Sequence, residues 1–176
     1  EDLNSSEGRT AAGLKDEGLK DAVIYPLRVK AGDEASCLNL NRAQTPKILG
    51  VPESLIKRGG FTFVASYSDS LPLSWDLIHS EPLVMAHGKT RGRIAAIVDF
   101  QSLTWALGKK VGDEISVRDE RGNEQKIFIA GAVANSILQG SLLISEDDFL
   151  RLYPSESGYR EFLIDAPNER LKDVAA

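Results

Sequence analysis

The chain has 176 residues, and its 21 Lys and Arg against 26 Asp and Glu give a formal net charge of −5. That length suits one ordinary domain or two small ones, and a composition with 42% hydrophobic and 27% charged residues is that of a folded chain rather than a disordered one. The acidic balance counts against nucleic-acid binding as the main role. A single cysteine, Cys37, excludes an internal disulfide and a zinc cluster built from cysteines.

The apolar stretches are too short for a transmembrane helix, which needs roughly 20 consecutive apolar residues. The most apolar one covers only residues 127–134. No signal-peptide pattern occurs at the N-terminus, and the chain begins with Glu1 rather than Met. We therefore expect a soluble unit that was processed or excised from a longer protein.

Residues 1–22 differ from the rest of the chain because charged residues and glycines dominate them. Glycine at this density disfavours a helix, so we predict a flexible arm or tether, followed by one domain over residues 23–176. In the first part of this domain, alternation and turn residues predict strands over 23–29, 47–51 and 61–65, a brief helix from Pro52 to Gly59-Gly60, and a long loop over 66–93 with one helical turn near 75–78.

The second part of the domain has a more regular pattern. Asp99 follows a buried strand at residues 94–98 and can cap a helix that ends at Gly108. Strands over 111–118 and 125–133 form a hairpin. The remaining elements are expected to be a strand over 142–144, a helix opened by residues 145–148 and stopped by Pro154, a strand over 162–166, and a final helix over 168–174 that ends early.

One motif imitates a phosphate-binding loop. Gly88-Lys89-Thr90 precedes an apolar strand that ends in an aspartate, as in nucleotide-binding proteins. That loop also needs a glycine five places earlier, where this chain has Leu83, and a helix directly after the threonine, where a strand is expected. We therefore predict that the chain binds no nucleotide.

Catalytic and metal-binding residues are equally hard to assemble from the sequence. His79 and His87 lie in a loop rich in serine and proline, which does not promise the convergent ligands of a metal site. Cys37 with either histidine would make a nucleophile and a base, but no sequence context places them together. The sequence therefore assigns no catalytic, cofactor-binding or metal-ligating residue, and no cofactor.

Four residues are candidates for contact with a partner. Trp75 lies in a polar loop, and aromatic residues are enriched at interfaces, so we predict that it is exposed. Arg58, Arg91 and Arg93 lie near glycines and are able to face an anionic partner. Trp105 is instead expected in the core, on the apolar side of its helix.

Three stretches of the chain together resemble a known family. They are residues 35–61, with Ser-Cys-Leu-Asn-Leu at 36–40, the hairpin over 107–133, with Gly-Asp-Glu-Ile-Ser-Val at 112–117, and residues 140–167, with Phe-Leu-Ile-Asp-Ala-Pro at 162–167. In this order they are similar to the extracytoplasmic domain of FtsX-like ABC transporter permeases, the group that includes MacB. The resemblance covers most of residues 23–167. It implies an α+β fold of short helices and mixed strands, with an α/β lobe and a smaller β-rich lobe over roughly residues 94–144.

The resemblance also implies a non-catalytic role on the extracytoplasmic (periplasmic) side of a cell membrane. Such a domain couples the ATP-driven motion of the transporter to an envelope protein, a lipoprotein or an exported substrate. Its partners are then a cytoplasmic ATPase subunit, reached through the parent permease, and a second permease copy. Two other functions stay open: a small hydrolase-like enzyme that uses Cys37 or the His79/His87 loop, and a free-standing periplasmic binding module.

Overall fold

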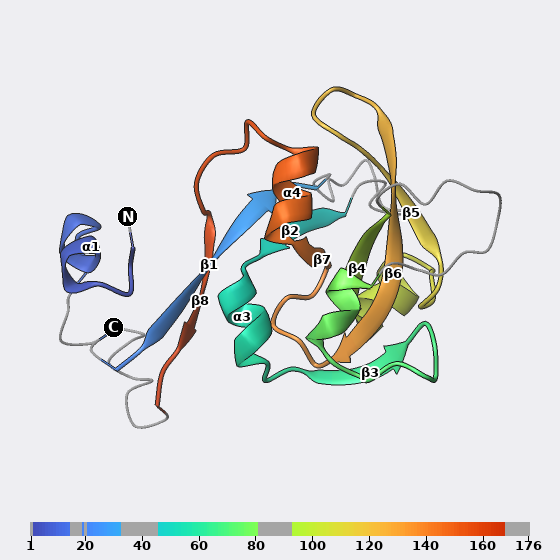
Figure 1. Ribbon diagram of the computed structural model, residues 1–176, viewed down its shortest axis with the longest axis horizontal. Coiled ribbons are helices and arrows are strands. Elements are labelled where there is room, and N and C mark those ends of the chain that lie inside the picture. The colour runs from blue at the N-terminus through green and yellow to red at the C-terminus, as the bar shows by residue number, and fades with distance from the viewer. Residues whose placement is uncertain (1, 15–18, 20, 33–45, 81–92, 168–176) are drawn as a thin grey trace. The chain divides into compact units, whose positions relative to one another are not determined.

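The computed structural model describes residues 2–14, 19, 21–32, 46–80 and 93–167. The chain divides into two compact units, a smaller one of residues 1–27 and 159–176 and a larger one of residues 28–158. The elements are α1 (Ser6–Ala11), β1 (Val23–Lys30), β2 (Lys47–Val51), α3 (Glu53–Arg58), β3 (Thr62–Ser66), η1 (Trp75–His79), β4 (Ile94–Asp99), η2 (Ser102–Ala106), β5 (Glu114–Arg118), β6 (Glu124–Ala134), β7 (Ser141–Ser145), α4 (Glu146–Leu152) and β8 (Glu161–Asp165) (Figure 1).

The larger unit is built on a mixed sheet with the strand order β3-β6-β4-β7-β2-β1, in which β5 also pairs with β6. β4 runs parallel to β6, and β2 runs parallel to β7, whereas the other neighbours are antiparallel. All strands expected from the sequence are present, within a few residues of the expected bounds. The chain is therefore an α+β protein with a mixed sheet and few, short helices, which confirms the expected class.

The long strand β6 organises one side of this sheet. β4 pairs with residues 127–133 of β6, so β4 fills one edge over most of its length. β5 pairs with residues 124–128 and β3 with residues 131–134, and both therefore share the opposite edge, one after the other. The register shifts within β6's pairing with β4 and again with β3, as expected where a strand must bend to serve several partners.

Both faces of the central strand β4 are covered, since every residue from Ile94 to Asp99 is buried. On one face a large apolar cluster joins sheet residues to Leu103 of η2 and to Phe149 of α4, which is fully buried. On the other face Ala95, Phe128 and Ala130 pack with Leu77 of η1. Apolar strands of this kind, buried on both sides, explain why residues 94–98 and 127–133 read as continuous hydrophobic runs.

The helix ends follow from short-range chemistry that the sequence showed. The hydroxyl of Ser145 accepts a hydrogen bond from the backbone N–H of Asp148, 3.2 Å away, at the start of α4. The Ser145 hydroxyl in turn donates a hydrogen bond to the carboxylate of Asp148, at 2.9 Å. Gly59 ends α3 with a positive φ of 69°, a conformation that favours glycine.

The smaller unit corrects one expectation. Glycine-rich residues 1–22 were not expected to form a helix, but residues 6–11 form α1, because the Ser5 hydroxyl caps it by accepting from the N–H of Gly8. The Asn4 side chain also forms two hydrogen bonds with the backbone of Ile24. Its amide nitrogen donates to the Ile24 carbonyl at 2.9 Å, and its amide oxygen accepts from the Ile24 N–H at 2.7 Å. Ile24 lies in the first part of β1, which pairs antiparallel with β8. At least part of the predicted arm is thus tied to a strand of its own unit.

The range of the expected β-rich lobe, residues 94–144, contains strands that also pair outside it. Two strands of that range pair with strands outside it, β6 with β3 and β7 with β2. The apolar cluster of the larger unit likewise includes both Ile48 and Ile127. The final helix expected over residues 168–174 lies outside the described residues.

Candidate functional site

The predicted contact residue Trp75 is not at the surface. It begins η1, and only 4% of it is exposed. Its ring packs edge-on against Phe61 and Phe63, with centroids 5.3 Å and 5.7 Å away. The expectation that Trp75 is exposed is therefore wrong: two phenylalanines at the start of β3, which the polar sequence around Trp75 did not reveal, enclose it.

The predicted arginines are not gathered into one site by the described structure. Arg58 lies at the end of α3, and its guanidinium donates to the carbonyl of Gly59 at 3.0 Å. Arg93 precedes β4, and its guanidinium lies 3.3 Å from the carboxylate of Glu114 on β5. Arg91 lies outside the described residues. Their role as partner contacts stays a prediction.

The residues considered for catalysis lie mostly outside the described part of the chain. Cys37, His87 and the Gly88-Lys89-Thr90 motif all belong to segments that the structure does not describe. His79 is described, at the end of η1, with its Nε2 atom 3.5 Å from the carboxylate of Glu53. Within residues 2–14, 19, 21–32, 46–80 and 93–167, no group of three or more His, Cys, Asp or Glu side chains is placed to hold a metal ion.

A buried polar network begins at Asp99, the last residue of β4, of which 1% is exposed. One carboxylate oxygen accepts from the backbone N–H groups of Gln101 and Ser102, at 3.1 Å and 3.2 Å, which is the cap expected from the sequence. The other oxygen accepts from the N–H of Ser136, 3.1 Å away, in the loop after β6. The Ser102 hydroxyl accepts from the N–H of Gly140 in the same loop, at 2.8 Å. This network binds η2 and the loop over residues 135–140 to the end of the sheet.

The helix held by this network is a π-helix, a rare geometry that often occurs at functional sites. Its core residue is Leu103, which is 1% exposed, whereas Trp105 is 85% exposed. The expectation that Trp105 is in the core is therefore wrong. Leu103 and Leu107 are four residues apart and both pack on the core, so Trp105, midway between them, faces away. That spacing was the signal that would have placed Trp105 correctly.

Trp105 belongs to a set of exposed apolar residues on the two segments that Asp99 joins. Phe100, on the short helical turn that leads into η2, is 47% exposed. Ile137, in the loop after β6, is 79% exposed. We call Phe100, Trp105 and Ile137 the apolar surface. Its side chains project from segments that a buried carboxylate holds in place.

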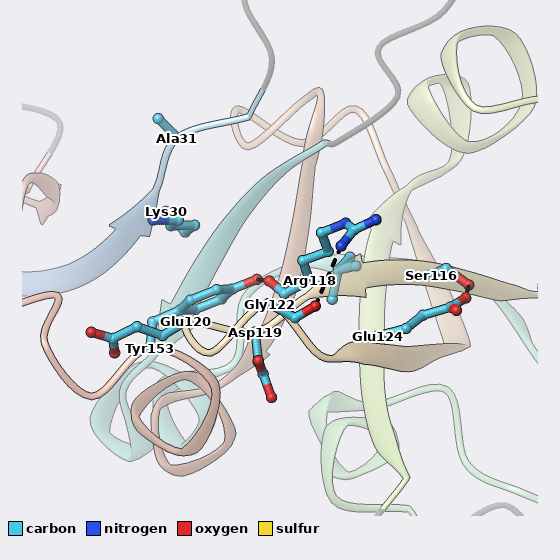
Figure 2. A pocket seen from close by; sticks show the side chains of 10 residues that line it. Lys30, Ala31, Ser116, Arg118, Asp119, Glu120, Gly122, Glu124 and Tyr153 are labelled. Carbon is cyan, nitrogen blue, oxygen red and sulfur yellow. Dashed lines mark hydrogen bonds between the residues drawn. The ribbon is translucent and has the colours of Figure 1, made fainter.

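A hollow of about 770 Å³ lies elsewhere in the larger unit (Figure 2). It is lined by Lys30 and Ala31 at the end of β1, by residues 116–118 of β5, by the turn that joins β5 to β6, and by Tyr153 after α4. The Tyr153 hydroxyl donates to the carbonyl of Arg118 at 3.0 Å, and the Lys30 ammonium lies 5.3 Å from the centre of the Tyr153 ring. In the view of Figure 2 the side chains of Lys30 and Arg118 lie above the Tyr153 ring and that of Asp119 lies below it.

Hydrogen bonds lower the pKa of two carboxylates of the hollow, those of Asp119 and Glu120. Desolvation raises the pKa of Asp119, but hydrogen bonds from Asn123, Gln125 and the backbone of Arg121 together keep its pKa below the usual value. The pKa of Glu120 is lowered chiefly by hydrogen bonds from Ser155, whose N–H lies 2.9 Å from the carboxylate. Both side chains therefore stay charged at neutral pH and brace the turn between β5 and β6.

The pKa of Tyr153 shifts in the opposite direction, because no hydrogen bond offsets the effect of burial. Burial raises the pKa of the phenol, and the nearby carboxylates of Asp119 and Glu156 raise it further. Tyr153 therefore stays protonated at neutral pH, as its role as a donor to Arg118 requires.

Comparison with known proteins leaves the family open: no protein-family model matches the chain, and no curated protein is similar to it. Among the described residues, no helix combines the length and the apolar character that crossing a membrane requires.

Proposed function

We propose that the chain is the extracytoplasmic domain of an FtsX-like, MacB-like ABC transporter permease. In this proposal the domain performs no chemistry. It couples the ATP-driven motion of the transporter to an envelope protein, a lipoprotein or an exported substrate by direct contact. The parent chain supplies the membrane anchor, the second permease copy and the link to the cytoplasmic ATPase subunit. The resemblance of residues 35–61, 107–133 and 140–167 to that family, together with the α+β fold, supports the proposal.

The observation that carries a contact function is the exposure of Trp105. A tryptophan that is 85% exposed leaves a large apolar area in water, and Phe100 and Ile137 add to it on the linked segments. Tryptophan is among the residues that contribute most to protein–protein binding when a partner covers it.

The second feature that favours a contact function is the rigidity of the apolar surface. The Asp99 carboxylate is buried and accepts hydrogen bonds from both η2 and the loop after β6. Removal of the central acceptor of a buried hydrogen-bond network of this kind costs about 2–3 kcal/mol. Side chains on a fixed scaffold lose little conformational entropy when a partner binds, which favours affinity.

The test uses the parent gene and the parent protein. Apolar spans of about 20 residues encoded before Glu1 and beyond Ala176 are expected, and their absence would refute the permease assignment. In cells of the source organism, a photo-crosslinking amino acid at position 105 should capture an envelope partner. The same amino acid at Leu73, which is 53% exposed on another segment of the larger unit, should not.

The functional counterpart is a transport measurement with matched substitutions. Trp105→Ser should abolish transport by the assembled transporter while the permease still dimerises and binds its ATPase. Leu73→Ser should leave transport unchanged. Equal transport by both variants would remove the apolar surface from the mechanism.

A further inference from the structure

One edge of strand β5 faces no strand among the described residues. The pairing of β5 with β6 shows which backbone groups are used: the N–H of Asp119 bonds to the carbonyl of Asn123, and the N–H of Ile129 to the carbonyl of Asp113. In an antiparallel pair, backbone groups of alternate residues point to opposite edges. The odd-numbered residues of β5 therefore bond to β6, and the backbone groups of Glu114, Ser116 and Arg118 point to the other edge.

The structure closes this edge at one end. The carbonyl of Arg118 accepts the hydroxyl of Tyr153, and the N–H of Glu120 donates to the carbonyl of Leu152 at 3.0 Å. Toward the start of the strand, the N–H and carbonyl groups of Ser116 and Glu114 and the N–H of Arg118 have no backbone partner in the described part of the chain. Unpaired strand edges of this kind are templates for an added strand.

The hollow lies along this edge, and most charged side chains in it and beside it have a hydrogen-bond or ion-pair partner. The Glu124 carboxylate accepts the Ser116 hydroxyl at 2.6 Å, and the Glu114 carboxylate is flanked by Arg93 and Lys126, at 3.3 Å and 3.2 Å. The carboxylates of the turn are bonded as described above. Lys30 is paired with Glu156 at 2.7 Å.

Arg118 is the exception among these charges. Its guanidinium makes one long contact within the described residues, 3.4 Å to the carbonyl of Gly122, and forms no ion pair with them. A guanidinium has five N–H groups arranged to bind a carboxylate in a bidentate way. Its side chain lies beside the hollow in Figure 2, on the same exposed face of β5 as Ser116.

We propose that the β5 edge binds an extended, acidic segment of a partner protein as an added strand. The segment's backbone bonds to the outward groups of Ser116 and its neighbours, and one of its Asp or Glu side chains pairs with Arg118 in the hollow. Backbone pairing supplies affinity for an extended chain. Arg118, which forms no ion pair within the described residues, supplies the preference for an acidic chain. This inference rests on the proposed contact function and names a second surface for it, separate from the apolar surface.

The probe is a displayed library of random heptapeptides, selected on the purified chain. Selected peptides should be enriched in β-branched residues and should carry Asp or Glu at one shared position. On binding, amide exchange at Ser116 and Arg118 should slow in ¹⁵N spectra, while exchange in α4 stays unchanged. A library that yields no binder, or binders without the acidic position, would overturn the proposal.

Two substitutions and one control separate the parts of the interaction. Ser116→Pro removes an outward N–H at an edge where proline is tolerated, and should weaken peptide binding about tenfold. Arg118→Gln should weaken it about threefold to fivefold and remove the preference for Glu over Gln in the peptide. Arg121→Gln, an exposed arginine in the adjoining turn, should leave binding unchanged.

If Ser116→Pro disturbs the fold, the backbone hydrogen bonds are removed from the side of the peptide instead. Methylation of its alternate backbone nitrogens should abolish binding in one register of methylated positions and spare it in the other. Equal binding in both registers would overturn strand addition. The two proposals are refuted by different results. If the photo-crosslinking amino acid at position 105 captures no envelope partner but the peptides still bind, the proposed function is refuted and strand addition at β5 is not.

Discussion

Gly50 is the position where a single methyl group should test the packing of the larger unit. It lies in β2, opposite Arg28 of β1, beneath the helix α4. A Cβ atom built on Gly50 would lie 2.9 Å from both Cβ and Cγ of Phe149 and 3.2 Å from Cβ of Arg28. Phe149 is fully buried, so its ring cannot swing out into solvent. The close atoms are also next to the backbone of α4, so the helix itself must shift.

The expected cost of Gly50→Ala follows from two opposing effects. Overpacking of a well-filled core costs about 1–3 kcal/mol. Replacing glycine restricts the unfolded chain and returns about 0.4–1 kcal/mol, since the backbone at Gly50 has no positive φ to strain. The free energy of unfolding of the larger unit should therefore fall by about 1–2 kcal/mol.

Urea unfolding followed by the fluorescence of the buried Trp75 measures this change. The midpoint should fall while the slope of the transition stays the same. Gly131→Ala is the matched control. Its new Cβ would meet a terminal methyl of Leu77 at 2.8 Å, which is able to rotate away, and the backbone carbonyl oxygen of Ala65 at 3.3 Å, which requires a shift of only a few tenths of an ångström. Gly131→Ala should therefore cost less than Gly50→Ala. An unchanged midpoint for Gly50→Ala, or a larger loss for Gly131→Ala, would refute the packing of Phe149 on Gly50.

Three further predictions concern single side chains. Asp99→Ala should lower the free energy of unfolding by about 2–3 kcal/mol, measured in urea, because it leaves buried N–H groups without an acceptor. Trp105→Ser should change stability by less than about 0.5 kcal/mol in the same assay, since the side chain is in water. The pKa of Asp119 is lower in the folded state than in the unfolded one, so its carboxylate contributes stability that is present above the unfolded pKa and is lost as the pH falls through the folded one. The loss of thermal stability between pH 6 and about pH 3 should thus be smaller in Asp119→Asn than in the natural chain.

The sequence was a good guide wherever a structure depends on neighbouring residues. Ser145 with Asp148, Asp99 with Ser102, and Gly59 after α3 are capping and turn chemistry that acts over a few positions. The buried strands β4 and β6 are long apolar runs, which few other structures accommodate. The α+β class and nearly all strand positions followed from such local signals.

The candidate surfaces depended on distant residues and were not predictable in this way. Trp75 is buried because Phe61 and Phe63, which lie in a different segment of the chain, enclose it. The apolar surface also needs the Asp99–Ser136 hydrogen bond, which joins residues 37 positions apart. No sequence pattern in either segment predicts that hydrogen bond.

The sequence by itself thus determined the positions of the strands and of most described helices, α1 excepted, because hydrophobic period and capping act within one turn or one pleat. Only the tertiary structure decided that Trp75 is buried and which edge of β5 has no neighbouring strand among the described residues. Both depend on which elements lie side by side in the sheet. That choice is made by the summed burial of the whole core, to which each local pattern contributes only a part.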